Sequence, residues 1–307
     1  MNRRAGARAA VQDSAITLPK ERLLPIGKSK LYCREIGNGP TILMLHGSPF
    51  DHSYLLPEMD RFANSYHLVY YDQRGRGRSA AGWSPEDVSW ATDLTDLESV
   101  RQQLQLDPTI LLGHSQAGLL ALEYALRYPQ RVSRLILLNP APASSEEWAR
   151  VGKDWNERYP ARAQELEAVY ASATYAEGDP DAEEAGNRIW FRHAFAREKD
   201  LTTILARFRC RSKADVLRWR AIFHRLMADT LLAPGYNLFP RVEALRVPTL
   251  LVSGDHDFVP PWQRAAERLA RALPDAHLAM ITDCGHFPYL ERPRELRDIF
   301  AAFLRTP

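Results

Sequence analysis

The sequence has few cysteines and no long apolar run. Its three cysteines, Cys33, Cys210 and Cys284, are an odd number without C-x-x-C spacing, which argues against a disulfide framework or a structural zinc site. No stretch approaches the roughly 20 apolar residues that a membrane-spanning helix needs, and no apolar signal-peptide core follows the arginines of the first segment. We therefore expect a cytoplasmic protein without a membrane partner.

A strong charge of either sign is also missing. The 40 basic and 38 acidic residues give a formal net charge of +2. Such a balance creates no overall field that would attract nucleic acid or an anionic membrane. We therefore expect no nucleic-acid partner, and the substrate has to be inferred from local motifs. Nothing in the sequence indicates an oligomeric state.

Short buried runs alternate with amphipathic stretches at both ends of the sequence. Strand-like runs begin at Thr41, Tyr66, Thr109, Val132, Pro248 and Ala276, and helix-like stretches cover residues 86–105, 116–128, 262–272 and 293–304. This alternation predicts an α/β fold with a mostly parallel central sheet flanked by helices. The segment before Thr41 alternates in polarity, which suits an antiparallel hairpin at one edge.

The middle of the chain has a different pattern. Residues 141–240 contain no strand-like run, but tryptophans and phenylalanines are spread through charged, helix-compatible sequence. We interpret residues 141–240 as a helical cap inserted into a core domain of residues 21–140 and 241–307. Residues 1–20 are interpreted as a disordered tail.

The strongest local motif surrounds Ser115. The segment Gly113-His114-Ser115-Gln116-Ala117-Gly118 follows an apolar strand-like run and opens a helix-like stretch. Small residues on both sides of a serine relieve crowding in a tight strand-to-helix turn, which makes the hydroxyl project from the sheet edge. The motif predicts Ser115 as a nucleophile. The alternative is a turn with a helix cap.

A serine is a weak nucleophile at neutral pH, so it needs a base and a group that orients the base. The turn at residues 254–260 supplies two candidate acids, Asp255 and Asp257, and His286 follows the last expected strand. We predict His286 as the general base because of this position. Three competing histidines, His46, His114 and His256, are explained as turn or packing residues.

Acyl transfer also needs hydrogen-bond donors for the developing oxyanion. The backbone N–H of Gln116 lies directly after the nucleophile at a helix N-terminus, and the loop at residues 46–50 offers a second donor. We predict Ser48 for the second, because Pro49 has no N–H. The alternative for this loop is an ordinary turn.

Two other segments could suggest different chemistry. The string at residues 71–79 is rich in glycine and arginine, but it lacks the spacing of a phosphate-binding loop, and its glycines permit a turn after a strand. Arg74 is expected to buttress the site. Cys284 lies two residues before His286, yet it has no base of its own and is interpreted as a small buried residue.

Together, His46-Gly47, Asp72-Gln73-Arg74-Gly75, the Ser115 motif, Asp257 and His286 resemble the α/β-hydrolase superfamily from about residue 31 to residue 303. The D-Q-R-G-x-G-x-S string of residues 72–79 is similar to that of its proline iminopeptidase branch. The resemblance implies an α/β-hydrolase fold, no metal and no cofactor. It also favours Asp257 over Asp255, because the acid of this fold usually lies three residues after the glycine and precedes a Val-Pro pair.

Departures from the branch leave the substrate open. The branch typically has H-G-G-P-G where this chain has His46-Gly47-Ser48-Pro49-Phe50, and a tryptophan where this chain has Gln116. Its W-x-x-W-E amine-binding pattern is not recognisable in residues 141–240. A serine rather than an aspartate at position 115 argues against the haloalkane dehalogenase and epoxide hydrolase branches.

Three functions are compatible with these residues. The first is a carboxylesterase-like hydrolase acting on a small-molecule ester through an acyl-serine, with Trp190 and Phe191 expected to bind the substrate. The second is a proline iminopeptidase-like aminopeptidase acting on short peptides, whose amine would be held by a cap carboxylate. The candidate carboxylates are Glu183, Glu184 and Glu198. The third is a small-molecule receptor with little turnover.

Overall fold

One twisted sheet organises the protein. The computed structural model describes residues 18–305, whose strands form an eight-stranded sheet in the order β1-β2-β4-β3-β5-β6-β7-β8. Neighbouring strands from β4 through β3 to β8 are parallel, whereas β2 is antiparallel to both β1 and β4. The predicted mostly parallel α/β sheet with an antiparallel hairpin at its edge is confirmed. The strands are β1 (Lys20–Ile26), β2 (Ser29–Ile36), β3 (Thr41–Leu45), β4 (His67–Tyr71), β5 (Thr109–His114), β6 (Val132–Leu138), β7 (Thr249–Gly254) and β8 (Ala276–Ile281).

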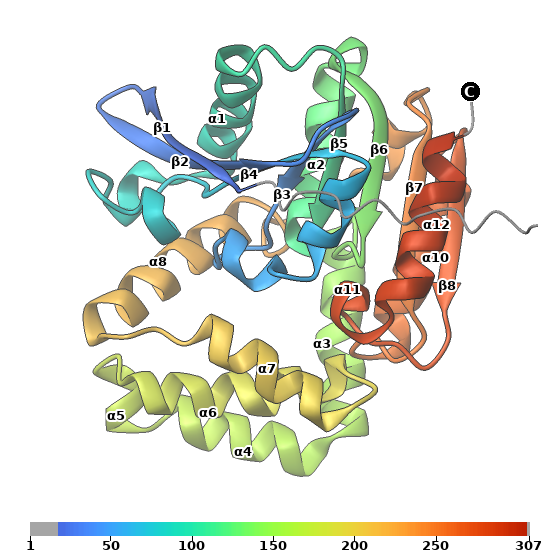
Figure 1. Cartoon of the computed structure of the whole chain (residues 1–307). Coiled ribbons are helices and arrows are strands. Elements are labelled where there is room, and N and C mark those ends of the chain that lie inside the picture. Colours follow the sequence, from blue (N-terminus) through green and yellow to red (C-terminus); the bar gives the residue numbers. More distant parts are fainter. Residues whose placement is uncertain (1–17, 306–307) are drawn as a thin grey trace, which may run out of the picture.

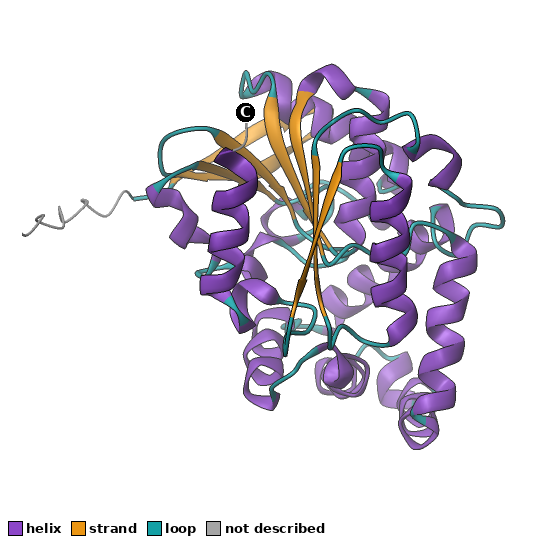
Figure 2. Ribbon diagram, turned by 90° about the vertical axis from the view of Figure 1, so that its right-hand side faces the viewer, coloured by secondary structure: helices purple, strands orange, loops and turns teal. Residues whose placement is uncertain are grey.

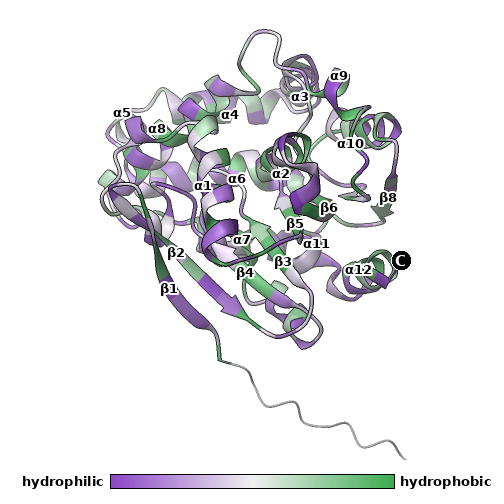
Figure 3. Cartoon of the chain, turned by 90° about the horizontal axis from the view of Figure 1, so that it is seen from above, coloured by the Kyte–Doolittle hydropathy of each residue, from purple (hydrophilic) through white to green (hydrophobic). Residues whose placement is uncertain are grey.

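Helices cover both faces of this sheet (Figure 2). Viewed from above, α1, α2 and α10 lie on one side and α12 on the other, with the hydrophobic strands β5 and β6 between them (Figure 3). The helices are α1 (Trp90–Gln103), α2 (Gln116–Arg127), α3 (Ser145–Arg158), α4 (Pro160–Tyr170), α5 (Ala173–Ala176), α6 (Pro180–Phe191), α7 (Glu198–Phe208), α8 (Lys213–Asp229), α9 (Phe239–Val242), α10 (Pro260–Ala272), α11 (Pro288–Glu291) and α12 (Pro293–Arg305). Among residues 18–305, no helix combines the length and the apolar character needed to cross a bilayer.

The central strands are buried along their whole length because both of their faces are covered. Every residue of β5 and of β7 is buried, as expected for parallel strands between two helical layers. The residues of the edge strand β8 before Ile281 are instead half-buried or exposed. The core therefore fixes the positions at which β3, β5, β7 and β8 end, and the candidate site residues directly follow these ends.

The segment between β6 and β7 consists of helices. It contains α3 to α8 and the short α9, and α4 to α7 lie together below the sheet in Figure 1. These helices fall in the predicted cap, whose treatment as a separate domain stays a prediction. Of the predicted tail at residues 1–20, residues 1–17 lie outside the described part, and Lys20 is the first residue of β1.

Candidate active site

Ser115 occupies a sharp turn between β5 and α2. Its backbone has φ 58 and ψ −127, a conformation that non-glycine residues rarely adopt and that often marks functional turns. The chain needs glycine on both sides, because a Cβ at Gly113 would lie 2.2 Å from the Ala117 carbonyl oxygen and one at Gly118 would lie 2.9 Å from Pro140 Cβ. At Ala117 itself a methyl group is accommodated and buried. This geometry matches the one expected of a serine at a tight strand-to-helix turn.

His286 and Asp257 form a buried pair. His286 Nδ1 lies 2.8 Å from Asp257 Oδ1, and the two residues are 2% and 0% exposed. Asn139 Nδ2, at the end of β6, donates to Asp257 Oδ2 at 2.8 Å and to the Gly285 carbonyl oxygen at 3.1 Å. With Nδ1 donating to the carboxylate, Nε2 of His286 is left as the proton acceptor.

Asn139 is a site residue that the sequence reasoning missed. It fixes the second oxygen of Asp257 and the turn that carries His286. Its own backbone has φ 44, and asparagine tolerates this left-handed region better than most residues. The Asn-Pro pair after a buried strand was the available signal, but such pairs are common at ordinary turns.

The competing acid lies outside this arrangement. Asp255 is exposed, and its Oδ1 lies 2.6 Å from His256 Nδ1 and accepts a hydrogen bond from the Cys284 N–H. Burial raises the pKa of the Cys284 thiol, which keeps it protonated and poorly nucleophilic. Asp255, His256 and Cys284 therefore shape the turn beside His286.

The two other histidines are already bound at both ring nitrogens. His114 contacts the Tyr54 hydroxyl at 2.7 Å and the His286 carbonyl oxygen at 2.9 Å. His46 Nε2 accepts a hydrogen bond from the Gln73 N–H at 3.0 Å, and its Nδ1 lies 3.1 Å from the Gly47 carbonyl oxygen. Burial lowers the pKa of His46 to about 3 and holds that of His114 well below its usual range. Both rings are neutral supports.

The loop after β3 lies against Ser115. A Cβ added at Gly47 would lie 3.3 Å from Ser115 Cβ, so only glycine permits this approach without displacement. Among the described residues, no acceptor is bound by the backbone N–H of Ser48 or by that of Gln116. Both donors therefore remain available next to Ser115, as an oxyanion site requires.

A cavity of about 470 Å³ contains both Ser115 and His286 in its wall. Trp190 and Phe191 line it, as do Ser48 and Gln116. Its aromatic lining comprises Phe50, Tyr54, Trp148, Tyr170, Tyr175, Trp190, Phe191, Phe208, Trp219, Phe223, Phe258, Trp262 and Phe287. A larger cleft of about 900 Å³ lies outside the stacked rings of Phe50 and Phe208, but neither Ser115 nor His286 lines it. The smaller, apolar cavity is the candidate substrate site.

Of the three candidate amine-binding carboxylates, only Glu183 lines the cavity. It is buried and forms an ion pair with Arg220 at 2.6 Å. Burial raises its pKa, and Arg220 partly offsets that effect. Glu184 pairs with Arg188 and Glu198 with Arg192, outside the cavity.

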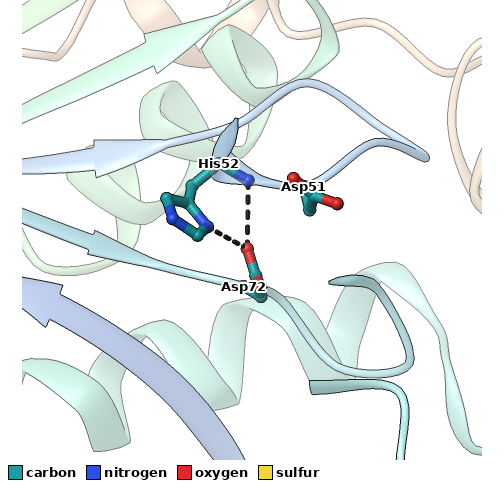
Figure 4. A group of neighbouring side chains, drawn as sticks. All are labelled: Asp51, His52 and Asp72. Carbon is teal, nitrogen blue, oxygen red and sulfur yellow. Dashed lines mark hydrogen bonds and ion pairs between the residues drawn. The ribbon is translucent and has the colours of Figure 1, made fainter. Parts of the chain in front are cut away.

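The acid of the string at residues 72–79, Asp72, has a structural role. Asp72 Oδ1 accepts hydrogen bonds from the backbone N–H of His52 at 3.0 Å and from its Nδ1 at 2.7 Å, and Oδ2 accepts one from the Arg78 N–H. Figure 4 draws these bonds between His52 and Asp72, with Asp51 beside them and unconnected. Because both carboxylate oxygens of Asp72 already accept hydrogen bonds, the group of Asp51, His52 and Asp72 is explained as a connection between two loops.

Arg74 supports the same region. Its guanidinium donates to both carboxylate oxygens of Asp96, at 2.8 and 2.6 Å, and lies over the Trp83 ring. Such a two-bond contact is geometrically specific. Arg74 thereby ties the string at residues 72–79 to α1, and it contacts no atom of the candidate catalytic residues.

Glu291 fastens the His286 turn to the segment after α6. Its two carboxylate oxygens accept hydrogen bonds from the Gly285 and Ala196 N–H groups, both at 2.9 Å. Burial nevertheless raises the pKa of Glu291 to about 7, because its effect exceeds that of these hydrogen bonds. The ionisation of this residue therefore links the stability of the site to pH.

We expect the Glu291→Gln variant to remove a pH-dependent part of stability. Because the folded pKa of about 7 lies above the usual 4.5, this contribution is present below the lower value and is lost as pH rises through the higher one. The loss amounts to about 3 kcal/mol. Unfolding free energies should be measured with guanidinium from pH 4 to pH 8. A difference between wild type and variant that does not change with pH would contradict the assignment.

The sequence is similar to those of known hydrolases. The chain matches the sequence model of the alpha/beta hydrolase family over residues 42–299. It is 27% identical to a proline iminopeptidase of Lactobacillus delbrueckii subsp. bulgaricus, with 92% of this chain and 97% of that protein covered. It is also 27% identical to a putative carbamate hydrolase of Rhizobium rhizogenes, with coverage of 87% and 93%.

A solved proline iminopeptidase structure from Mycobacterium smegmatis shares the fold, with a TM-score of 0.70, 22% identity and coverage of 93% of this chain and 97% of that one. The chain therefore belongs to the alpha/beta hydrolase family, and it is similar to proline iminopeptidases. The resemblance inferred from the motifs is confirmed. The names of the relatives differ in the bond that is cleaved, so they establish a hydrolase and leave the substrate to be argued from the site.

Proposed function

We propose that this protein hydrolyses a small-molecule ester or related acyl bond through an acyl-serine intermediate. Ser115 is the nucleophile, His286 the general base and Asp257 the acid that orients it. The observation that carries the proposal is that the strained Ser115 turn and His286, which is paired with the buried Asp257, border one aromatic-lined cavity of about 470 Å³. This volume is in the range of small-molecule sites, and Trp190 and Phe191 would contact the acyl group.

The chemistry follows from the proton positions. His286 Nε2 takes the proton of the Ser115 hydroxyl as Oγ attacks the acyl carbon, and Asp257 stabilises the imidazolium that forms. The backbone N–H groups of Ser48 and Gln116 would donate to the oxyanion. The leaving oxygen then receives the proton from His286, and the acyl-serine remains. Water then attacks the acyl-serine and gives a proton to His286. His286 passes this proton to Oγ of Ser115 as the acid is released.

An aminopeptidase is the second candidate. It is favoured by the 27% identity to a proline iminopeptidase and by the single carboxylate, Glu183, in the cavity wall. Against it stands Arg220, which already pairs with Glu183. A substrate ammonium would have to displace this guanidinium or remain unpaired in an apolar cavity, and either change costs free energy.

Two substrate pairs separate these candidates. We expect hydrolysis of p-nitrophenyl butyrate with a kcat/KM at least about tenfold above that of prolyl p-nitroanilide, because the cavity favours apolar groups and lacks a free carboxylate. The second pair is prolyl p-nitroanilide and its N-acetylated form, whose cleavage should differ little. The Ser115→Ala variant serves as the blank for every substrate.

Either of two results would contradict the esterase proposal. One is anilide cleavage that depends on Ser115, exceeds the ester rate and disappears when the proline amine is acetylated, which would establish the aminopeptidase. The other is stoichiometric binding of esters with almost no turnover, which would favour a small-molecule receptor.

A further inference from the structure

The far part of the catalytic cavity contains polar groups in an otherwise apolar wall. Arg220 and His224 lie one turn apart on α8, and Glu183 and Asn187 lie one turn apart on α6; all four line the cavity. Apolar side chains on the same two helices, including Trp190, Phe223 and Met227, line the rest of the path. The polar groups therefore form one cluster, which we call the polar end.

The distance between the polar end and Ser115 follows from positions along α8. The side-chain amide of Gln116, the residue after Ser115, lies 3.5 Å from Met227 Sδ. Arg220 is two turns before Met227, which corresponds to about 10 Å along the helix axis. A substrate whose acyl carbon lies at Ser115 therefore reaches Arg220 only through a chain of medium length.

Arg220 is held rigidly and still has unused donors. Its Nε donates to Glu183 Oε2 and its Nη1 to the Tyr175 carbonyl oxygen, both at 2.6 Å, while the guanidinium lies over the Tyr175 ring. Nη2 is buried and close to the same carboxylate oxygen, but no acceptor is aligned with its N–H bonds. A buried donor without an aligned acceptor is costly, so an incoming oxygen atom would be favoured there.

The neighbouring side chains have unused capacity as well. The side chains of Asn187 and His224 make no hydrogen bond to another described residue. An amide and an imidazole can each donate a hydrogen bond, and each can also accept one. The only carboxylate of the polar end, Glu183, is engaged by Arg220. The polar end thus presents hydrogen-bonding groups without protein partners to the cavity and is complementary to an uncharged oxygen function.

We propose that the polar end binds an uncharged oxygen function, a carbonyl or hydroxyl, on the far part of the substrate's acyl chain. Glu183 already balances the charge of Arg220, so a carboxylate would add an uncompensated negative charge in a largely apolar cavity. The substrates are therefore medium-chain acyl esters oxygenated away from the scissile bond. This inference rests on the esterase function proposed above.

The test compares p-nitrophenyl octanoate with matched esters that carry a ketone, or a carboxylate, at the far end of the same chain. We expect the kcat/KM of the ketone ester to exceed that of octanoate by about tenfold, and the carboxylate ester to show no such gain. The preference should vanish in the matching butyrate series, whose chain cannot reach Arg220. Preference for the carboxylate ester, or equal rates for ketone and octanoate esters, would overturn the proposal.

Variants connect the preference to the residues. The double change Glu183→Gln/Arg220→Met removes the guanidinium donors of Arg220 without leaving an unpaired charge, and it should reduce the ketone-to-octanoate ratio by about tenfold. Arg218→Met is the matched control, since Arg218 is on the same helix but lines the larger cleft of about 900 Å³ instead of the catalytic cavity. An unchanged ratio in the double variant would refute the role of Arg220. If that variant does not fold, the wild-type chain-length series decides.

Failure of the proposed function gives a different result. If no ester shows turnover that depends on Ser115, the esterase proposal is wrong. The polar end is then tested by calorimetry, which measures binding to the wild-type protein of alcohols that have the same carbon chain as the acyl group, with and without the ketone. Tighter binding of the ketone compound, lost in the double variant, would support the polar end; equal binding would refute it.

Discussion

Replacing Ser115 by alanine is expected to reduce kcat for an ester substrate by about five to six orders of magnitude, the scale typical of removing a serine nucleophile. The change deletes only the hydroxyl oxygen. The turn at φ 58 is imposed by the packing of Gly113 and Gly118, so the variant should fold and retain its cavity. Steady-state kinetics and thermal unfolding of the purified variant check both statements.

Covalent labelling provides an independent readout for the same residue. A fluorophosphonate should modify the wild-type protein at Ser115 and leave the alanine variant unmodified, because only an activated serine reacts readily. Ser99→Ala is the control. Ser99 lies on α1, where its hydroxyl donates to the Thr95 carbonyl oxygen, and this variant should be labelled like the wild-type protein. If the Ser115→Ala variant keeps more than a small fraction of its turnover, Ser115 is not the nucleophile.

The strands could be predicted from the sequence because burial on both faces makes them continuous apolar runs. The helix predicted at residues 86–105 was less accurate. The structure begins α1 at Trp90, after a short 3-10 helix at Pro85–Asp87. Ser89 accepts a hydrogen bond from the Thr92 N–H and so caps α1. Periodicity runs through such an interruption, and only the capping serine marks the true start.

The candidate triad was accessible from the sequence because each member follows a strand of the same parallel sheet. Parallel strands bring their carboxyl ends to one edge, so order along the chain indicates proximity. The hydrogen bond between His286 and Asp257 agrees with the preferred acid, although the catalytic roles themselves remain the proposal above. Asn139 escaped notice because its role depends on the position of a side chain relative to Asp257, 118 residues away.

The cap could not be read in the same way. Its helices cross at angles and depths that no local pattern encodes, so the sequence did not distinguish Glu183 from Glu184 or Glu198. Only the packing of α6 against α8 brings Glu183 to Arg220 across 37 residues. Substrate selectivity depends on such contacts, whereas the shared chemistry depends on the sheet.

Replacing Asp257 by asparagine is expected to reduce kcat by about four orders of magnitude while leaving the fold intact. The amide has one oxygen and one NH2 group where the carboxylate has two acceptors. One of these faces Nδ1 of His286 and the other faces Nδ2 of Asn139. If the NH2 group faces the histidine, it favours the wrong tautomer, in which Nε2 carries the proton and cannot accept one from Ser115.

Asp255→Asn is the matched control, because Asp255 has the same chemistry two residues earlier but contacts His256 and the Cys284 N–H instead of His286. Its kcat should stay within about threefold of wild type, since exposed ion pairs contribute little. The pH profile of kcat/KM adds a second criterion: Asp257→Asn should change this profile, and Asp255→Asn should not. Equal losses in the two variants would show that the turn as a whole, rather than the buried carboxylate, orients the histidine.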